Sequence, residues 1–157
     1  MLIRTDAESI VQLDDIDKRI IAELQVDGRM PFSTLAPLIG LSDASTRQRV
    51  NRLVERGVIS IVAITDALAL GFGFQAMVFV SVVGDPTEVA EALEPVPEVT
   101  YLVITAGRFN LMVELVCVDA EHLLELTTMI SKLPGVAGTE VTTFLKMVKV
   151  KYDWGAR

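Results

Sequence analysis

A basic segment, residues 42–57, lies in an otherwise acidic chain. It holds four arginines against two acidic residues, a net charge of +2, whereas the 157-residue chain carries −7. Because charge attraction is screened beyond about 10 Å at ordinary salt, this local balance matters more than the total. Arginines bind phosphates, and the amides of Gln48 and Asn51 can pair with base edges. The segment therefore indicates nucleic-acid binding, with a merely solvated helix face as the alternative.

The same segment has the spacing of an amphipathic helix that is capped by Ser42 and ended by Gly57. Thr46, Val50 and Leu53 fall on one side, which we expect to pack on neighbouring helices. The opposite side and its borders carry small, amide and guanidinium groups. The residues that we expect to contact DNA are Ser42, Ala44, Ser45, Arg47, Gln48, Arg49, Asn51 and Arg52.

Two shorter helices are predicted before this segment. An apolar stripe follows Asp14, which is a good N-cap, with Asp17 placed as in a capping box; Asp27-Gly28 ends this helix. The second helix covers about residues 32–39, where Pro37 should kink or shorten it. Three short helices of this kind describe a helix-turn-helix, and the β-branched run over residues 58–64 is expected as a strand that forms a wing.

The second half changes to the pattern strand, helix, strand, strand, helix, strand. The expected strands cover residues 74–83, 98–105, 109–118 and 136–151, and the helices open at Asp85 and Asp119. Each half closes its helix with an apolar-Pro-x-Val phrase, so the halves form a weak internal repeat. This α+β pattern predicts a ferredoxin-like βαββαβ sandwich whose antiparallel sheet has one open face. The mean hydropathy of +0.47 is high, so we expect that face to oligomerise.

Composition removes several classes of protein. One Cys and one His exclude a disulfide framework and a Cys/His zinc site within one chain, and favour a reducing cytoplasm. No apolar run approaches the roughly 20 residues of a membrane helix. We expect no catalytic site, metal or cofactor. The predicted organisation is a flexible extension, a winged helix-turn-helix, a linker, a sensing and oligomerisation domain and a tail, over residues 1–12, 13–65, 66–73, 74–151 and 152–157.

Taken together, these segments resemble the Lrp/AsnC (leucine-responsive/asparagine-responsive) transcriptional regulators over about residues 13–150. The resemblance is carried by Leu13-Asp14-Asp15-Ile16-Asp17, Asp27-Gly28-Arg29, Leu35-Ala36, Gly40-Leu41-Ser42, Arg49-Val50, Arg52-Leu53 and Gly57-Val58-Ile59. It implies homodimers that assemble into octamers or open arrays, bind double-stranded promoter DNA and hold a small molecule, commonly an amino acid, between effector domains.

The loop between the two central strands resembles the family's glycine-x-aromatic-aspartate loop. Gly107 permits a tight turn with exposed N–H groups, Arg108 offers a charge, and Phe109 offers an apolar wall. Asn110 departs from the family's aspartate and offers a weaker partner for an ammonium group. The resemblance implies that the effector is bound by Ala106, Gly107, Arg108, Phe109, Asn110, Thr139 and Thr142.

Two alternatives stay open. A DNA-coating architectural oligomer without an effector is compatible with Asn110. A sirohaem-decarboxylase-like enzyme on the same scaffold would need histidines, and the sequence offers only His122, on a predicted helix. The sequence favours a regulator that is sequence-specific and modulated by a small molecule.

Overall fold

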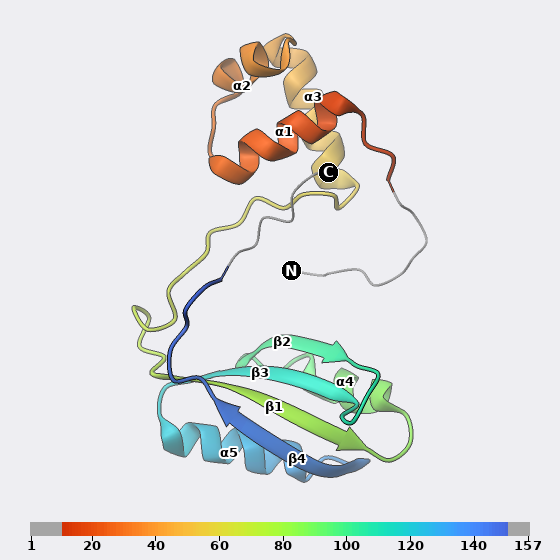
Figure 1. Ribbon diagram of the computed structural model, residues 1–157, viewed down its shortest axis with the longest axis vertical. Helices are drawn as coiled ribbons and strands as arrows, with labels where there is room; N and C mark the ends of the chain where they lie inside the picture. The colour runs from red at the N-terminus through yellow and green to blue at the C-terminus, as the bar shows by residue number, and fades with distance from the viewer. Residues whose placement is uncertain (1–10, 151–157) are drawn as a thin grey trace. The chain divides into compact units, whose positions relative to one another are not determined.

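The computed structural model describes residues 11–150, which divide into two compact units at Ile64/Thr65. Figure 1 shows the helices and strands of each unit. The expectations for most of the N-terminal extension, for the tail and for Lys151 lie outside these residues. No helix within residues 11–150 is long and apolar enough to cross a membrane.

The first unit contains three helices, α1 (Asp15–Val26), α2 (Phe32–Ile39) and α3 (Asp43–Glu55). Each begins and ends close to the predicted residues. Asp14 caps α1 by accepting a hydrogen bond from the backbone N–H of Asp17, and Ser42 caps α3 in the same way from Ser45. The buried side chains Ile20, Leu35, Ile39, Val50 and Leu53 join the three helices in one core.

The turn between α2 and α3 depends on Gly40. Its φ of 73° lies in the left-handed region, where a side chain is disfavoured. The backbone N–H of Leu41 then reaches the carbonyl of Ala36 at 3.0 Å, which closes the end of α2. Pro37 lies inside α2, which is only eight residues long.

The expected wing strand over residues 58–64 is wrong. The structure describes no strand between α3 and Phe74. The N–H groups of Val58 and Ile59 turn back to the carbonyl of Leu53, and the following segment pairs with no strand among residues 11–150. β-branched residues favour an extended backbone, but a strand also needs a hydrogen-bonded neighbour.

The second unit is a four-stranded antiparallel sheet with two helices. Its elements are β1 (Phe74–Val82), α4 (Pro86–Leu93), β2 (Val99–Ile104), β3 (Leu111–Cys117), α5 (Ala120–Ser131) and β4 (Val136–Thr143), and the strand order is β2-β3-β1-β4. This is the predicted ferredoxin-like topology. Figure 1 shows α4 and α5 on one face of the sheet, and Val78, Leu93, Leu111, Val113 and Ile130 are fully buried between them.

Strand β4 ends earlier than expected. Its last paired residue, Thr143, lies opposite Ala76, and the N–H of Phe144 bonds to the carbonyl of Gln75. Because β1 begins at Phe74, the chain beyond this point has no partner strand to continue along. The alternating residues 147–151 therefore do not extend the sheet over the described part of that range.

The register assigns side chains to the two faces. Val78 and Val80 face the helices, so Met77 and Phe79 point to the open face. Their antiparallel partners on β3, Glu114 and Met112, share that face, as does Tyr101 opposite Glu114. These residues of the open face are therefore mostly apolar, with the Glu114 carboxyl group among them.

We predict that Leu93→Ala destabilises the second unit by about 2–5 kcal/mol, because it leaves a cavity where α4 meets the sheet. The control is Leu124→Ala on α5, since Leu124 is 65% exposed and should change stability by less than about 0.5 kcal/mol. Urea unfolding measures both. Equal effects of the two variants would contradict the packing described.

Candidate nucleic-acid interface and ligand loop

The exposed side of α3 is built as predicted. Thr46, Val50 and Leu53 are buried against the other helices, which turns the opposite side of α3 outward. The side chains exposed there are Ala44, Ser45, Arg47, Gln48 and Asn51, with Arg49 and Arg52 partly exposed. The cap residue Ser42 is also exposed, and its hydroxyl donates to that of Ser45 at 3.0 Å. One helix thus presents amides, hydroxyls and cations together.

A shallow hollow of about 330 Å³ lies along this side of α3. It is lined by Leu41, Ser45, Gln48, Arg49 and Arg52. Its wall combines the helix-turn-helix turn with amide and guanidinium groups. Polar groups arranged in this way can pair with base edges and phosphate oxygens.

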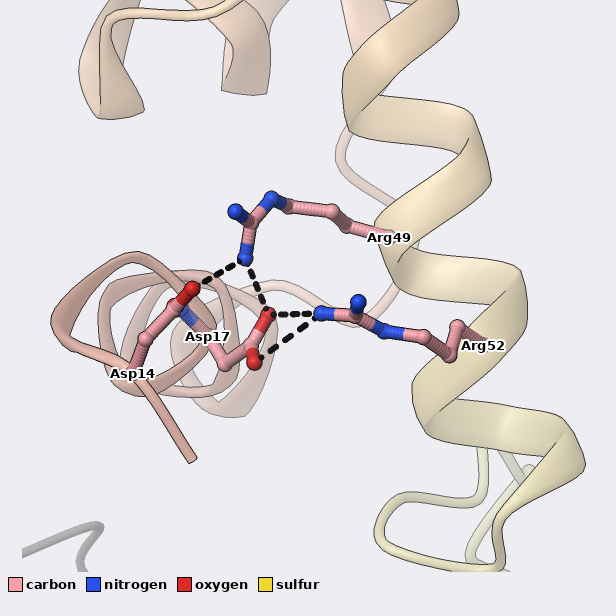
Figure 2. A network of polar contacts seen from close by, with 4 residues as sticks. All are labelled: Asp14, Asp17, Arg49 and Arg52. Carbon is pink, nitrogen blue, oxygen red and sulfur yellow. Dashed lines mark hydrogen bonds and ion pairs between the residues drawn. The ribbon is translucent and has the colours of Figure 1, made fainter. Parts of the chain in front are cut away.

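The two arginines of the hollow are anchored to the start of α1 (Figure 2). Arg49 Nη1 lies 2.7 Å from Asp14 Oδ2 and 2.8 Å from Asp17 Oδ1. Arg52 Nη2 lies 3.1 Å from each oxygen of Asp17. Asp17 is only 5% exposed, whereas Asp14 is 51% exposed. A buried carboxylate therefore fixes both guanidinium groups relative to the first helix.

These contacts lower the pKa of Asp14 and raise the pKa of Arg49. The backbone N–H of Asp17 lowers the pKa of Asp14 below its ordinary value of 3.8, and Arg49 lowers it further. Asp14 in turn raises the pKa of Arg49. A carboxyl group with a lowered pKa stabilises the fold above its ordinary pKa, and this contribution is lost as the pH falls through the lowered value.

The second half of the expected capping box is therefore wrong. Asp14 caps the helix, but the Asp17 carboxylate accepts hydrogen bonds from Arg49 and Arg52. The reason is burial, since a carboxylate removed from water is stabilised by a cation more than by a backbone N–H.

Arg47 has a partner that the sequence did not indicate. Its guanidinium lies 4.8 Å from the centre of the Phe32 ring at the start of α2, a cation–π contact. Asp14, Asp17 and Phe32 were thus missed as supports of the α3 arginines. The only sequence signal was Asp17 itself, an acidic residue just after the apolar Ile16 and three residues before Ile20.

The loop that joins β2 to β3 is pinned to β1. Asn110 donates its backbone N–H to the carbonyl of Val80 at 2.8 Å, and its side-chain Oδ1 accepts from the N–H of Val82 at 2.8 Å. The hydroxyl of Thr105 donates to the carbonyl of Phe109 at 2.8 Å. Gly107 has a φ of 156° and nothing near its Cβ position. The side-chain oxygen of Asn110 therefore holds the loop to the backbone of β1.

Aromatic and charged groups gather beside this loop on the open face. The rings of Phe109 and Phe79 lie 5.2 Å apart, and the Arg108 guanidinium lies 4.9 Å from the Phe109 ring. Arg108 Nη2 is 3.5 Å from Glu140 Oε2 in an exposed pair. Phe79 and Glu140 are opposite each other in the β1–β4 register. Sequence reasoning did not select either residue, because only strand pairing brings them to the loop.

Thr139 and Thr142 do not lie together. Thr142 is opposite Met77, on the open face, whereas Thr139 is opposite Val80, whose side chain faces the helices. Residues three apart in a strand point to opposite faces. The structure therefore brings Thr142, and not Thr139, to the face on which Arg108 and Phe109 lie.

Other titratable groups lie elsewhere. Burial on the open face raises the pKa of the Glu114 carboxyl group above 4.5. His122 Nε2 lies 3.6 Å from Glu98 Oε1, where the start of α5 meets the start of β2. Within residues 11–150, no three His, Cys, Asp or Glu side chains are grouped so as to hold a metal ion.

Comparison with known proteins follows the same division. Residues 13–54 match the AsnC-type helix-turn-helix domain, and residues 75–154 match the Lrp/AsnC ligand binding domain. The HTH-type transcriptional regulator FL11 of Pyrococcus horikoshii is 36% identical, over 88% of this chain and 93% of its own length. The crystal structure of the Mycobacterium tuberculosis leucine response regulatory protein is 30% identical with a TM-score of 0.80, over 88% of this chain and 96% of that one.

A second solved structure shares the fold at lower identity. It is a transcriptional regulator from Neisseria meningitidis in complex with L-Met, 21% identical with a TM-score of 0.80, over 90% of this chain and 95% of that one. Fold and site together define a transcriptional regulator with a helix-turn-helix DNA-binding domain and a ligand-binding domain. The chain belongs to the Lrp/AsnC family.

We predict that Asp17→Asn lowers the stability of the first unit by about 1–3 kcal/mol, because Arg49 and Arg52 lose the charge that they share. Thermal unfolding followed by circular dichroism measures the change. Asp15→Asn is the control, since Asp15 is exposed on the same turn. A wild-type melting curve for Asp17→Asn would contradict the anchoring role.

Proposed function

We propose that this protein is a sequence-specific regulator that inserts α3 into the major groove of its operator. The supporting observation is the outward side of α3, where Gln48, Ser45 and Asn51 are exposed between arginines. Gln pairs bidentately with adenine, Ser pairs with several bases, and arginines bind the flanking phosphates. The second unit and its C-terminal neighbourhood are acidic, with six basic against twelve acidic residues over 61–157, so DNA contact belongs to the first unit.

The functional unit proposed is a homodimer that assembles further, to an octamer. The open face of the sheet carries Met77, Phe79, Tyr101 and Met112, a composition suited to packing against a second copy. A two-fold dimer presents two copies of α3 about one helical turn apart, so the operator should be a pseudo-palindrome.

The ligand proposed for the second unit is an amino acid. The Neisseria regulator of the same fold is complexed with L-Met. Here the ring of Phe109 supplies an apolar wall and Arg108 a cation for a carboxylate. The Arg108–Glu140 pair is exposed on both sides, so a ligand carboxylate can replace Glu140 at little cost. Ala106, Gly107 and Asn110 complete the loop, with Thr142 on the same face and Thr139 as the less favoured contributor.

The proposal includes no enzymatic activity and no cofactor, and places the protein in the cytoplasm, where the chromosome is. Relatives are named transcriptional regulators. A sirohaem-decarboxylase-like activity has little support, since the sequence has one histidine, His122, which lies on α5 with Nε2 3.6 Å from Glu98 Oε1. A DNA-coating oligomer without an effector is an outcome that the experiments below detect.

Fluorescence anisotropy against genomic fragments, including the protein's own upstream region, tests DNA recognition at low and at physiological salt. Saturable binding to few fragments that survives the higher salt is expected. Gln48→Ala should then relax the preference at one base pair by about 1–3 kcal/mol. Equal affinity for all fragments would favour the coating oligomer. Absence of binding at both salt concentrations would contradict the proposal that the protein without ligand recognises its operator.

Asn110→Asp tests the ligand loop. The aspartate keeps an acceptor for the N–H of Val82 and adds a negative charge, so amino-acid affinity should rise about fivefold. Calorimetric titration across the amino acids measures it, with Arg108→Ala as the variant expected to lose binding. If no amino acid gives a heat of binding with either the wild-type protein or Asn110→Asp, amino-acid sensing is contradicted.

A further inference from the structure

The cluster of Asp14, Asp17, Arg49 and Arg52 has a formal charge of zero, although its two arginines line the hollow of α3. Acidic groups within hydrogen-bond distance cancel much of the attraction that the arginines would exert on a phosphate. The carboxylates at the start of α1 therefore weaken the positive potential of α3. Of the α3 arginines, Arg49 is the one that contacts both carboxylates.

The two carboxylates are not equivalent. Asp17 is 5% exposed and binds both arginines, so a protein that released it would leave an uncompensated buried charge. Asp14 is 51% exposed and contacts only Arg49 among these arginines, and water can solvate its carboxylate as soon as the contact opens. Figure 2 shows Arg49 placed between the two, with one nitrogen directed at both.

We propose that Asp14 is an exchangeable partner of Arg49 that a DNA phosphate displaces, and that it thereby lowers the affinity of the free protein for DNA of any sequence. Asp17 keeps its contact and holds Arg49 in place during the exchange. Because phosphate contacts carry no sequence information, Asp14 reduces binding to all sequences and leaves the preference among them unchanged. This inference rests on the proposed role of α3 in DNA binding.

Asp14→Asn is the decisive variant. Asparagine caps helices as well as aspartate does, so the hydrogen bond to the N–H of Asp17 can be kept while the charge is removed. The probe is a fluorescein-labelled duplex of arbitrary sequence, titrated by anisotropy over a series of salt concentrations. A thermal melt by circular dichroism checks that the variant is folded.

The expected result is tighter binding with a steeper salt dependence. In wild type the freed Asp14 carboxylate takes up a cation, which offsets the counterion that the phosphate releases on binding Arg49. Asparagine takes up none, so one more counterion is released on balance and the slope of log K against log salt steepens by about 0.9. The advantage of Asp14→Asn over wild type should therefore be about 3.5-fold larger at ~50 mM than at ~200 mM salt. Discrimination between the preferred genomic fragment and the arbitrary duplex should stay as in wild type.

Asp15→Asn is the matched control. Asp15 is exposed on the same turn and makes no ion pair in the part of the chain that the structure describes, so the variant changes the net charge equally without freeing an arginine. Its salt slope should equal that of wild type. If it strengthens binding as much as Asp14→Asn, the effect is one of general charge and the proposal is overturned.

Arg49→Gln separates this inference from the proposed function. In that background, adding Asp14→Asn should leave DNA affinity unchanged, and a remaining gain would overturn the inference. If Arg49→Gln and Gln48→Ala weaken or alter binding while Asp14→Asn behaves as wild type, only the exchange at Asp14 fails. If none of the variants alters DNA binding, the assignment of α3 itself fails.

Discussion

The buried carboxylate of Asp17 is the constraint on which the DNA-binding unit depends. It lies near the start of α1, yet it binds two arginines from α3. The ion pairs therefore fix α3, whose polar side chains face outward, to α1. A buried charge is costly unless it is fully paired, and two guanidinium groups supply that pairing. The apolar core of Ile20, Leu35 and Leu53 sets the distance between the helices, and the ion pairs set how the side chains of α3 are aimed.

In the second unit, the pairing of the strands positions the side chains beside the β2–β3 loop. Alternation along β1 sends Val78 and Val80 to the helices and Phe79 to the open face, where it meets Phe109 of the loop. The side-chain amide of Asn110 locks the loop onto β1 by accepting from Val82. The loop between β2 and β3 is thus held in place by the same register that builds the core.

Much of this architecture follows from the sequence, because helix caps and glycine turns are local signals. Asp14, Ser42, Asp85 and Asp119 each cap the helix that was expected. What failed depended on partners distant in the chain. The run over residues 58–64 has strand composition but no neighbour to pair with among the described residues. Strand β4 ends beside the first residues of its antiparallel partner β1.

The site shows the same limit. Periodicity identified the outward side of α3, since that depends on one helix alone. It did not show that Asp17 occupies Arg49 and Arg52, or that Glu140 lies beside Arg108, because those contacts join residues 32 to 35 positions apart in the sequence. Thr139 was grouped with Thr142 by resemblance, and strand alternation separates them.

The most direct test of the account is chemical protection of specifically bound DNA, with dimethyl sulfate as a probe of guanine N7 in the major groove. If α3 reads the operator as a two-fold dimer, protection should appear in the major groove at two half-sites about one helical turn apart. Gln48→Ala should weaken that protection. Protection confined to the minor groove, or spread evenly along the fragment, would contradict the account.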